Sequence, residues 1–186
     1  DEQFIVEARL LEHVIPCYGF RVTQKQLPPE LLIEKADALG VPRGPLLRQL
    51  KEGNDVVLSN GTIVKSEEVT GEVREGFKVT ILGDTKYCEN SIQLSEKADI
   101  VVHEGTFDIE TAELARLYGH STIVDAAEVC QNAYAKNLVV NHISARFLSS
   151  DLSNMLTQVK HYPFPIYIAE DLAEYSFVNG LLTKCK

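Results

Sequence analysis

From residue 76 onward, short apolar strands alternate with segments of helical periodicity, and this rhythm restricts the chain to few architectures. Strands that alternate with helices form a sheet that helices cover on one face or on both. We therefore predict an α/β fold. The predicted strands are residues 78–82, 99–102, 138–140, 166–168 and 175–178, and the predicted helices are residues 92–97, 109–117, 123–134 and 152–160.

The chain opens on a strand pattern, because residues 4–11 alternate as a strand does. Residues 18–22 form the second predicted strand. Pro16 interrupts the ladder between the two strands and leaves His13 at a strand end. The alternation is already in progress at the first residues and there is no initiator Met, which suggests a fragment or a processed or truncated chain.

Residues 23–70 have a different texture. They contain a helical stretch over residues 30–39, a turn with two prolines, and a second short helix that ends at Lys51. Asn60 and Gly61 both tolerate the positive φ of a tight hairpin turn and separate two short apolar runs. Because this segment has few apolar residues at long range, we interpret it as an inserted arm that stands away from the core.

Composition sets limits on function. A chain of 186 residues with 45% apolar residues is in the range of one domain with a real core, here residues 1–186. The formal charge of -9 argues against binding nucleic acid through bulk electrostatics, because such binders present a basic surface to phosphates. Any RNA contact must therefore be local.

The four cysteines, Cys17, Cys88, Cys130 and Cys185, lie far apart with no Cys-x-x-Cys pair. Neither a zinc knuckle nor a thioredoxin-type site is indicated. This usage is typical of reduced thiols, and we expect a cytoplasmic location. The apolar runs are too short to predict a membrane span, and the N-terminus lacks the progression of an export signal.

Ionisable residues follow several predicted strands, at the edge of an α/β sheet where ligands gather. Asp84 follows the strand 78–82 and is either a metal ligand or a cap of the next turn. His103 and Glu104 close the strand 99–102. We interpret His103 as a core histidine rather than a ligand. Glu104 should have a positive or hydrogen-bond-donating partner, because burial of a carboxylate is otherwise costly.

Two further histidines lie beside loops. His120 precedes the helix 123–134, where Ser121 or Thr122 can cap the helix, so His120 lies beside backbone N–H groups that suit a phosphate. Alternatively, His120 is a loop residue without a role. His142 ends the strand 138–140. Arg146, four residues on, is either a fork that holds a phosphate or an ordinary surface charge.

Five motifs therefore occur in a fixed order: Leu11–Arg21 around His13, Gly83-Asp84-Thr85, His103-Glu104-Gly105-Thr106-Phe107, His120-Ser121-Thr122 and His142-Ile143-Ser144-Ala145-Arg146. This set resembles the C-terminal motifs of ribonuclease Z, the two-zinc tRNA 3′-end endonuclease of the metallo-β-lactamase fold. The resemblance runs to about Asp171. It implies the C-terminal half of that α+β four-layer sandwich, with residues 23–70 as the family's flexible tRNA-binding arm.

The resemblance also implies an enzyme with two zinc ions. His13 would bind one metal, His142 the other, and Asp84 would bridge them. Water activated by the metals would cleave precursor tRNA, leaving a 3′-hydroxyl on the tRNA and a 5′-phosphate on the trailer. His120, oriented by Glu104, would stabilise the developing charge or protonate the leaving oxygen, and Arg146 would hold the phosphate.

The arm has an implied role in gripping tRNA. Arg43, Gly44 and Pro45 resemble the Gly-Pro tip of the family's arm. Over residues 42–53, Arg43, Arg48 and Lys51 stand against Glu52, which is a local excess of two positive charges. Over residues 22–70, however, six basic residues face seven acidic ones. The RNA contact therefore depends on the tip alone, and the alternative is a solvated helix face.

The chain departs from the family pattern at two points. Gly105 stands where the family usually has Ala, which could loosen Glu104. The family's His-x-His-x-Asp-His motif, which supplies the remaining zinc ligands and the expected general base, is missing, and no His-x-His occurs in the sequence. Each metal would then have two protein ligands, fewer than the usual three or four. We therefore predict that the chain alone binds zinc weakly or not at all and is inactive.

Half of a two-sheet fold would also expose apolar sheet surface beyond what a monomer usually shows. The missing half or another partner should cover it, and family members are commonly homodimers. The alternatives are another hydrolase of the same fold, or a non-catalytic RNA-binding or dimerisation fragment.

Overall fold

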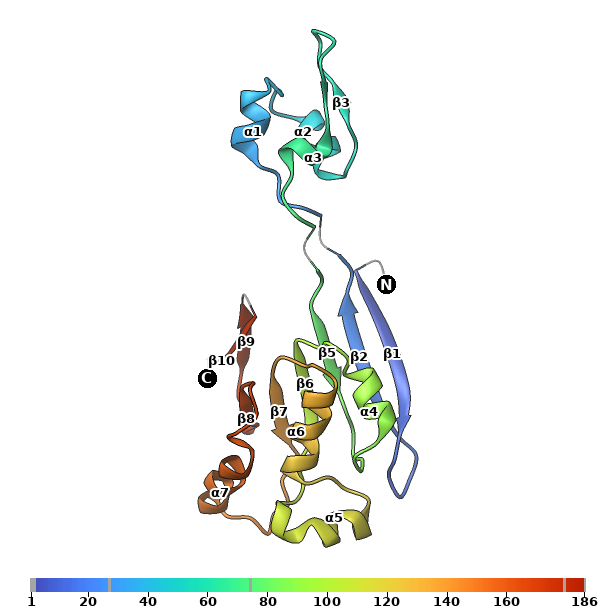
Figure 1. The fold of residues 1–186 in the computed structure, drawn as a ribbon, viewed down its shortest axis with the longest axis vertical. Helices are drawn as coiled ribbons and strands as arrows, with labels where there is room; N and C mark the ends of the chain where they lie inside the picture. The colour runs from blue at the N-terminus through green and yellow to red at the C-terminus, as the bar shows by residue number, and fades with distance from the viewer. Residues whose placement is uncertain (1–2, 27, 74, 179, 186) are drawn as a thin grey trace. The chain divides into compact units, whose positions relative to one another are not determined.

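In a computed structural model, the chain is described over residues 3–26, 28–73, 75–178 and 180–185. It divides into two compact units (Figure 1). The first unit comprises Asp1–Gln24 and Phe77–Lys186, and the second comprises Lys25–Gly76. Among the described residues, no helix has the length and apolar character to cross a membrane.

The first unit is built on a mixed six-stranded sheet in the order β1-β2-β5-β6-β7-β8. The strands β1, β2 and β5 pair antiparallel, whereas β5, β6, β7 and β8 pair parallel. The parallel strands follow the α/β rhythm of the sequence, so the predicted fold class is confirmed. The bounds are β1 Phe4–Leu11, β2 Cys17–Gln24, β5 Lys78–Ile81, β6 Ile100–Glu104, β7 Leu138–Asn141 and β8 Ile166–Ile168.

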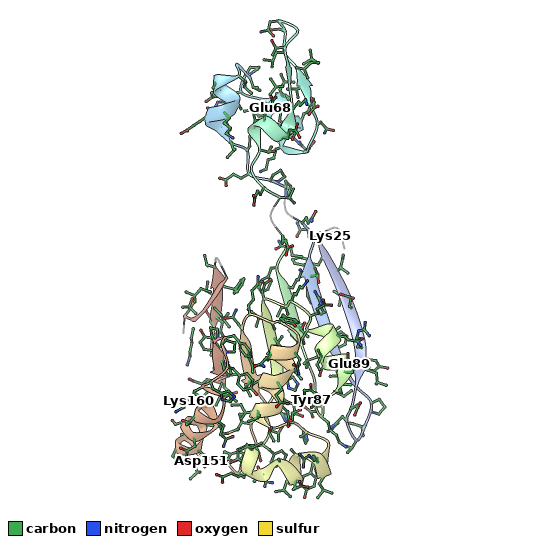
Figure 2. The ribbon with its side chains drawn as sticks, viewed as in Figure 1. Lys25, Glu68, Tyr87, Glu89, Asp151 and Lys160 are labelled. Carbon is green, nitrogen blue, oxygen red and sulfur yellow. The ribbon has the colours of Figure 1, made fainter. Side chains whose placement is uncertain are left out.

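Helices lie against one face of this sheet: α4 (Glu89–Leu94) contacts β1 and β2, α6 (Ile123–Asn132) contacts β6 and β7, and α7 (Ser149–Val159) contacts β8 (Figure 1). The core between sheet and helices is built of fully buried side chains such as Leu94, Leu138 and Met155. Glu89 and Asp151 (Figure 2) lie in the first turns of α4 and α7, where a carboxylate faces the positive end of the helix dipole.

The opposite face of β1, β2 and β5 is apolar and exposed. A Cβ atom on Gly19 would meet Leu94 of α4, so Gly19 faces the helices. Its neighbours Tyr18 and Phe20 therefore point away from the helices, because side chains alternate along a strand. Phe20 pairs with Ile81, and the exposed fractions of Tyr18, Phe20 and Ile81 are 52%, 47% and 48%. The expected apolar sheet surface is present.

A short hairpin of β9 (Tyr175–Val178) and β10 (Leu181–Lys184) completes the first unit. Tyr167 of β8 donates a hydrogen bond from its hydroxyl to the carbonyl of Leu182 at 2.7 Å. The pattern of the sequence predicted β9 but missed β10. The remaining elements are the short helix η1 (Ile109–Thr111) and α5 (Ala112–Tyr118), which together occupy the helix predicted at residues 109–117.

The second unit has a small core of its own, which the sequence interpretation missed. Its elements are α1 (Ile33–Ala38), α2 (Pro45–Lys51), β3 (Val56–Val57), β4 (Ile63–Val64) and α3 (Ser66–Val69). Leu50, Val64 and Val69 are almost fully buried, and the Ser66 hydroxyl donates to the Leu50 carbonyl at 2.6 Å. The strands β3 and β4 pair antiparallel, so the hairpin predicted at Asn60 and Gly61 is confirmed.

Candidate metal centre

The candidate site is formed at the carboxyl ends of the parallel strands. Asp84 follows β5, Glu104 ends β6 and His142 follows β7, and because these strands are parallel their carboxyl ends meet at one edge of the sheet. His13 comes from the loop between β1 and β2, and His120 lies between α5 and α6.

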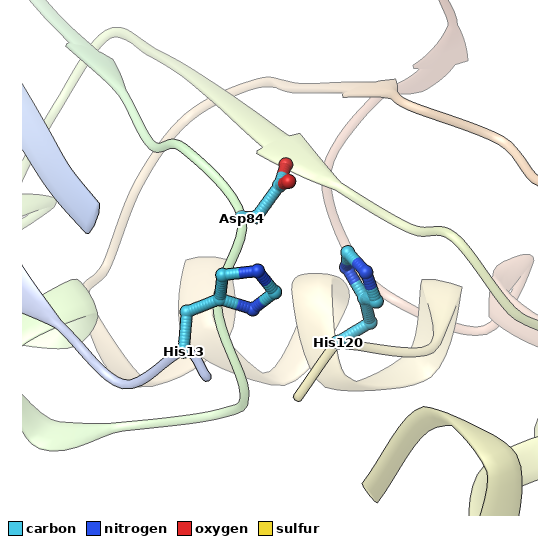
Figure 3. A group of neighbouring side chains, drawn as sticks. All are labelled: His13, Asp84 and His120. Carbon is cyan, nitrogen blue, oxygen red and sulfur yellow. The ribbon is translucent and has the colours of Figure 1, made fainter. Parts of the chain in front are cut away.

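The side chains of His13, Asp84 and His120 lie close to one another (Figure 3). Potential ligand atoms of His13, Asp84 and His120 lie within 4.8 Å of one another, and the same holds for Glu104, His120 and His142. His142 Nε2 lies 3.8 Å from Asp84 Oδ1. The ring centroids of His120 are 4.9 Å from His13 and 5.3 Å from His142. By these distances His120 is common to both groups.

Two of the histidines are oriented through their Nδ1 atoms. His13 Nδ1 lies 2.7 Å from the carbonyl oxygen of Gly119, and a carbonyl only accepts, so this nitrogen carries the proton. His120 Nδ1 lies 2.7 Å from Glu104 Oε1. In a neutral imidazole the Nε2 atom then presents its lone pair, which is the form that binds metals. Gly119 ends α5 with a left-handed φ of 80°, which glycine adopts readily.

Glu104 is held by several donors. The side chain is 1% exposed. Its Oε1 accepts from the N–H of Thr85 at 2.9 Å, and its Oε2 accepts from the N–H of Ser121 at 3.1 Å. The N–H and hydroxyl of Thr106 also donate to Oε2, at 3.2 and 2.6 Å. The prediction that Glu104 has donor partners is confirmed.

Gly105 has a different role from the one expected. A Cβ atom at this position would lie 2.4 Å from Cγ1 of Val140 and 3.4 Å from Cα of Ile123. The glycine therefore permits the close approach of β6 to β7 and α6. Glu104 is bonded through both of its carboxylate oxygens, which counts against the expected loosening at this residue.

His103 is a core histidine, as predicted. It is fully buried, and its Nδ1 lies 2.6 Å from the carbonyl oxygen of Glu104. Burial lowers the pKa of His103 below its usual value, since charging the ring inside the core is unfavourable. Further along the chain, Thr122 caps α6 and forms a capping box with Asp125.

Arg146 lies close to the histidines. Its guanidinium carbon is 5.0 Å from the centre of the Phe107 ring, and that ring is 6.2 Å from the ring of His120. Arg146 is exposed, and its Nε donates to the hydroxyl of Ser144 at 3.2 Å. A cation on an aromatic face beside the site is placed to attract an anion.

The predicted tip residues of the arm, Arg43, Gly44, Pro45 and Arg48, are exposed. Both arginines already have acidic partners. Arg43 pairs with Asp37 at 2.6 Å, and Arg48 pairs with Glu52 at 2.8 Å. The positive charge of these two arginines is therefore offset by neighbouring carboxylates.

The predicted contact of Glu104 with His120 is present, but two other orienting contacts were missed. Thr106 links Glu104 and His142, and the carbonyl of Gly119 holds His13. Thr106 lies far from His142 in the sequence, and His13 lies far from Gly119, so the spacing of these residues carries no signal for the two contacts. Imidazole nitrogens and a carboxylate are the donors that zinc prefers, so this set of side chains fits a zinc site.

Comparison with known proteins first defines the fold. The solved structure of the metallo-β-lactamase fold protein YhfI from Bacillus subtilis matches with a TM-score of 0.55 at 17% identity, covering 90% of this chain and 48% of that one. The short form of human tRNase Z matches with a TM-score of 0.52 at 26% identity, covering 92% and 42%. The chain thus has about half of a metallo-β-lactamase fold. No family model matches it.

Comparison of sequences is more specific. Ribonuclease Z of Anoxybacillus flavithermus is 43% identical over 180 residues, which is 96% of this chain and 57% of that protein. Ribonuclease Z of Geobacillus kaustophilus is 42% identical, over 97% of this chain and 59% of that protein. The chain is homologous to ribonuclease Z along nearly its whole length, and it spans a little over half the length of these relatives.

Proposed function

We propose that the complete protein to which this chain belongs is a zinc-dependent endoribonuclease that removes the 3′ trailer of precursor tRNA. The observation that carries the proposal is the convergence of His13, His120 and His142 on Asp84, in a chain 43% identical to a ribonuclease Z. Cleavage would leave a 3′-hydroxyl on the tRNA and a 5′-phosphate on the trailer.

Three of the side chains would hold the metals. His13 would bind one zinc ion and His142 the other, with Asp84 between them, since a carboxylate can bridge two cations. When bound, the metals would neutralise phosphoryl charge and lower the pKa of water to about 7. The Nδ1 contact of His13 supports this assignment, because it leaves the Nε2 lone pair available to bind a metal.

His120 and Glu104 would act on the leaving group. The carboxylate of Glu104 accepts from His120 Nδ1 at 2.7 Å, which fixes the orientation of the imidazole ring. A proton on His120 Nε2 could then pass to the leaving 3′ oxygen, as general acids do. Arg146, on the face of Phe107, would hold the phosphate through paired hydrogen bonds.

The second unit, Lys25–Gly76, would grip the tRNA away from the cleaved bond. Exposure of Arg43, Gly44, Pro45 and Arg48 supports this role. To contact phosphates, the two arginines would leave their ion pairs with Asp37 and Glu52. Little stability would be lost, because exposed ion pairs of this kind contribute only about 0.2–1 kcal/mol.

The site needs ligands from outside this chain. The sequence has no His-x-His motif, and the apolar face of β1, β2 and β5 is exposed. We propose that the segment bearing the missing motif packs on that face and completes both metal sites. The chain alone should therefore bind zinc weakly and be inactive, and homodimer formation by the complete protein stays a prediction.

The test is to incubate the zinc-loaded complete protein with a precursor tRNA and to map both product ends. We expect a single cut at the trailer boundary, with a 3′-hydroxyl and a 5′-phosphate. Asp84→Ala should remove zinc and activity together, while Glu113→Gln on the exposed side of α5 should keep both. A zinc-loaded protein that hydrolyses small esters or lactams and leaves tRNA intact would refute the proposal.

A further inference from the structure

Thr106 lies between the side chains of Glu104 and His142. Its hydroxyl oxygen is 2.6 Å from Glu104 Oε2 and 2.8 Å from His142 Nδ1, and its side chain is buried, with 6% of the residue exposed. These contacts join a carboxylate at the end of β6 to a histidine after β7. Thr106 has no role in the function proposed above.

The number of protons fixes the direction of these hydrogen bonds. A hydroxyl has one proton to donate, and an ionised carboxylate only accepts. Glu104 also accepts from the N–H groups of Thr85 and Ser121, so both of its carboxylate oxygens act as acceptors. The Thr106 proton therefore goes to Glu104, and the hydroxyl oxygen accepts from His142 Nδ1.

His142 must then carry its proton on Nδ1. The lone pair of its neutral ring is on Nε2, the atom that lies 3.8 Å from Asp84. The backbone of His142 has a φ of 55°, a left-handed conformation that a residue with a Cβ atom rarely adopts. A fixed side-chain contact helps to keep the ring in place at this unusual position.

We propose that Thr106 is a positioning residue, which sets the tautomer and the ring orientation of His142 and couples them to Glu104. One carboxylate then orients two histidines: His120 directly, and His142 through the Thr106 hydroxyl. The tautomer holds independently of the function proposed above, whereas its consequence for zinc binding rests on that function.

The test uses ¹⁵N-labelled histidine and NMR of the metal-free protein, at a pH where His142 is neutral. Ring nitrogen shifts and their couplings to ring protons distinguish the two tautomers. We expect wild type and Thr106→Ser to have the proton on Nδ1 of His142, and Thr106→Val to lose this preference. Thr80→Val is the matched control, because it removes another buried threonine hydroxyl, which lies in β5 and donates to the carbonyl of Leu94 at the end of α4.

The second readout is zinc affinity of the complete protein. Loss of a contact that orients a metal ligand lowers metal affinity by about 10- to 100-fold, so Thr106→Val should weaken zinc binding by that factor. Thr106→Ser, which keeps the hydroxyl, should bind zinc as wild type does. A proton on Nε2 of His142 in wild type would overturn the proposal even if Thr106→Val does not fold. An unchanged tautomer in a folded Thr106→Val would also overturn it, whereas failure of tRNA cleavage with the tautomer intact would count only against the proposed nuclease.

Discussion

Three histidines of the site share one arrangement: each forms a hydrogen bond through Nδ1. The acceptors are the carbonyl of Gly119 for His13, the carboxylate of Glu104 for His120 and the hydroxyl of Thr106 for His142. The common result is that the Nε2 atoms are the ones available to a metal or a substrate. Orientation of these three imidazole rings is thus built into this chain.

Glu104→Gln should uncouple this arrangement. A glutamine side chain has one acceptor oxygen, so its NH₂ group would face N–H donors that now bond to a carboxylate oxygen. In the complete enzyme we expect kcat to fall by about 10²- to 10⁴-fold, the usual range for loss of acid–base catalysis, with a smaller change in KM. Glu96→Gln, exposed beyond the end of α4, is the control. A wild-type kcat for Glu104→Gln would contradict the role given to the carboxylate.

Gly105→Ala should destabilise the protein by about 1–3 kcal/mol, because the added methyl group would overlap with Val140. Val140→Ala removes the atom in the way, so the double variant should recover part of the loss. Urea unfolding measures both effects as shifts in the free energy of unfolding. Equal stability of Gly105→Ala and wild type would show that the strands have room to separate.

The sequence predicted the positions of the site residues better than their contacts. Asp84, Glu104 and His142 could be placed because strand ends are recognisable from apolar runs. The bonds of Thr106 and Gly119 could not, since they depend on how loops fold over one another. The close approach at Gly105 was missed for the same reason.

At the scale of elements, helices and strands were predicted correctly where neighbouring residues in the sequence determine them. Asn60 and Gly61 predicted the hairpin of β3 and β4, and the apolar runs predicted β5 to β8. The core of the second unit was missed because Leu50, Val64 and Val69 belong to three different elements, α2, β4 and α3, and meet only when the unit folds. The strand β10 was missed because no sequence pattern was assigned to residues 181–184.

The ion pairs of the second unit give a prediction about tRNA binding. Asp37→Ala with Glu52→Ala frees Arg43 and Arg48, so we expect tighter binding of precursor tRNA. Arg43→Ala with Arg48→Ala should weaken binding and lower the slope of log K against log salt by about one for each phosphate that is no longer neutralised. Filter binding at several salt concentrations measures both.

Glu170→Ala, which frees Lys184 in the first unit, is the matched control and should leave tRNA affinity nearly unchanged. Hydrolysis of a small phosphodiester by the complete enzyme should not change in either double variant. If the arginine variants bind tRNA as tightly as wild type, the second unit has no part in gripping the substrate.

At the scale of the molecule, the first unit is a sheet with helices on one face. The side chains of Tyr18, Phe20 and Ile81 are exposed on the other face, and the chain covers 48% of the metallo-β-lactamase fold protein that it matches. The fold class followed from the order of strands and helices. The segment that covers the exposed face of β1, β2 and β5 could not be predicted from these residues. An apolar surface indicates that its partner is apolar, but it does not identify the partner.

The most direct measurement of the central claim is cleavage of precursor tRNA, with zinc present, by this chain alone and by this chain mixed with the His-x-His-x-Asp-His segment of a homologous ribonuclease Z. We predict no cleavage by either part, cleavage at the trailer boundary by the mixture, and none by a mixture carrying Asp84→Ala. Cleavage by this chain alone, or an assembled zinc-loaded mixture that leaves the tRNA uncut, would contradict the account.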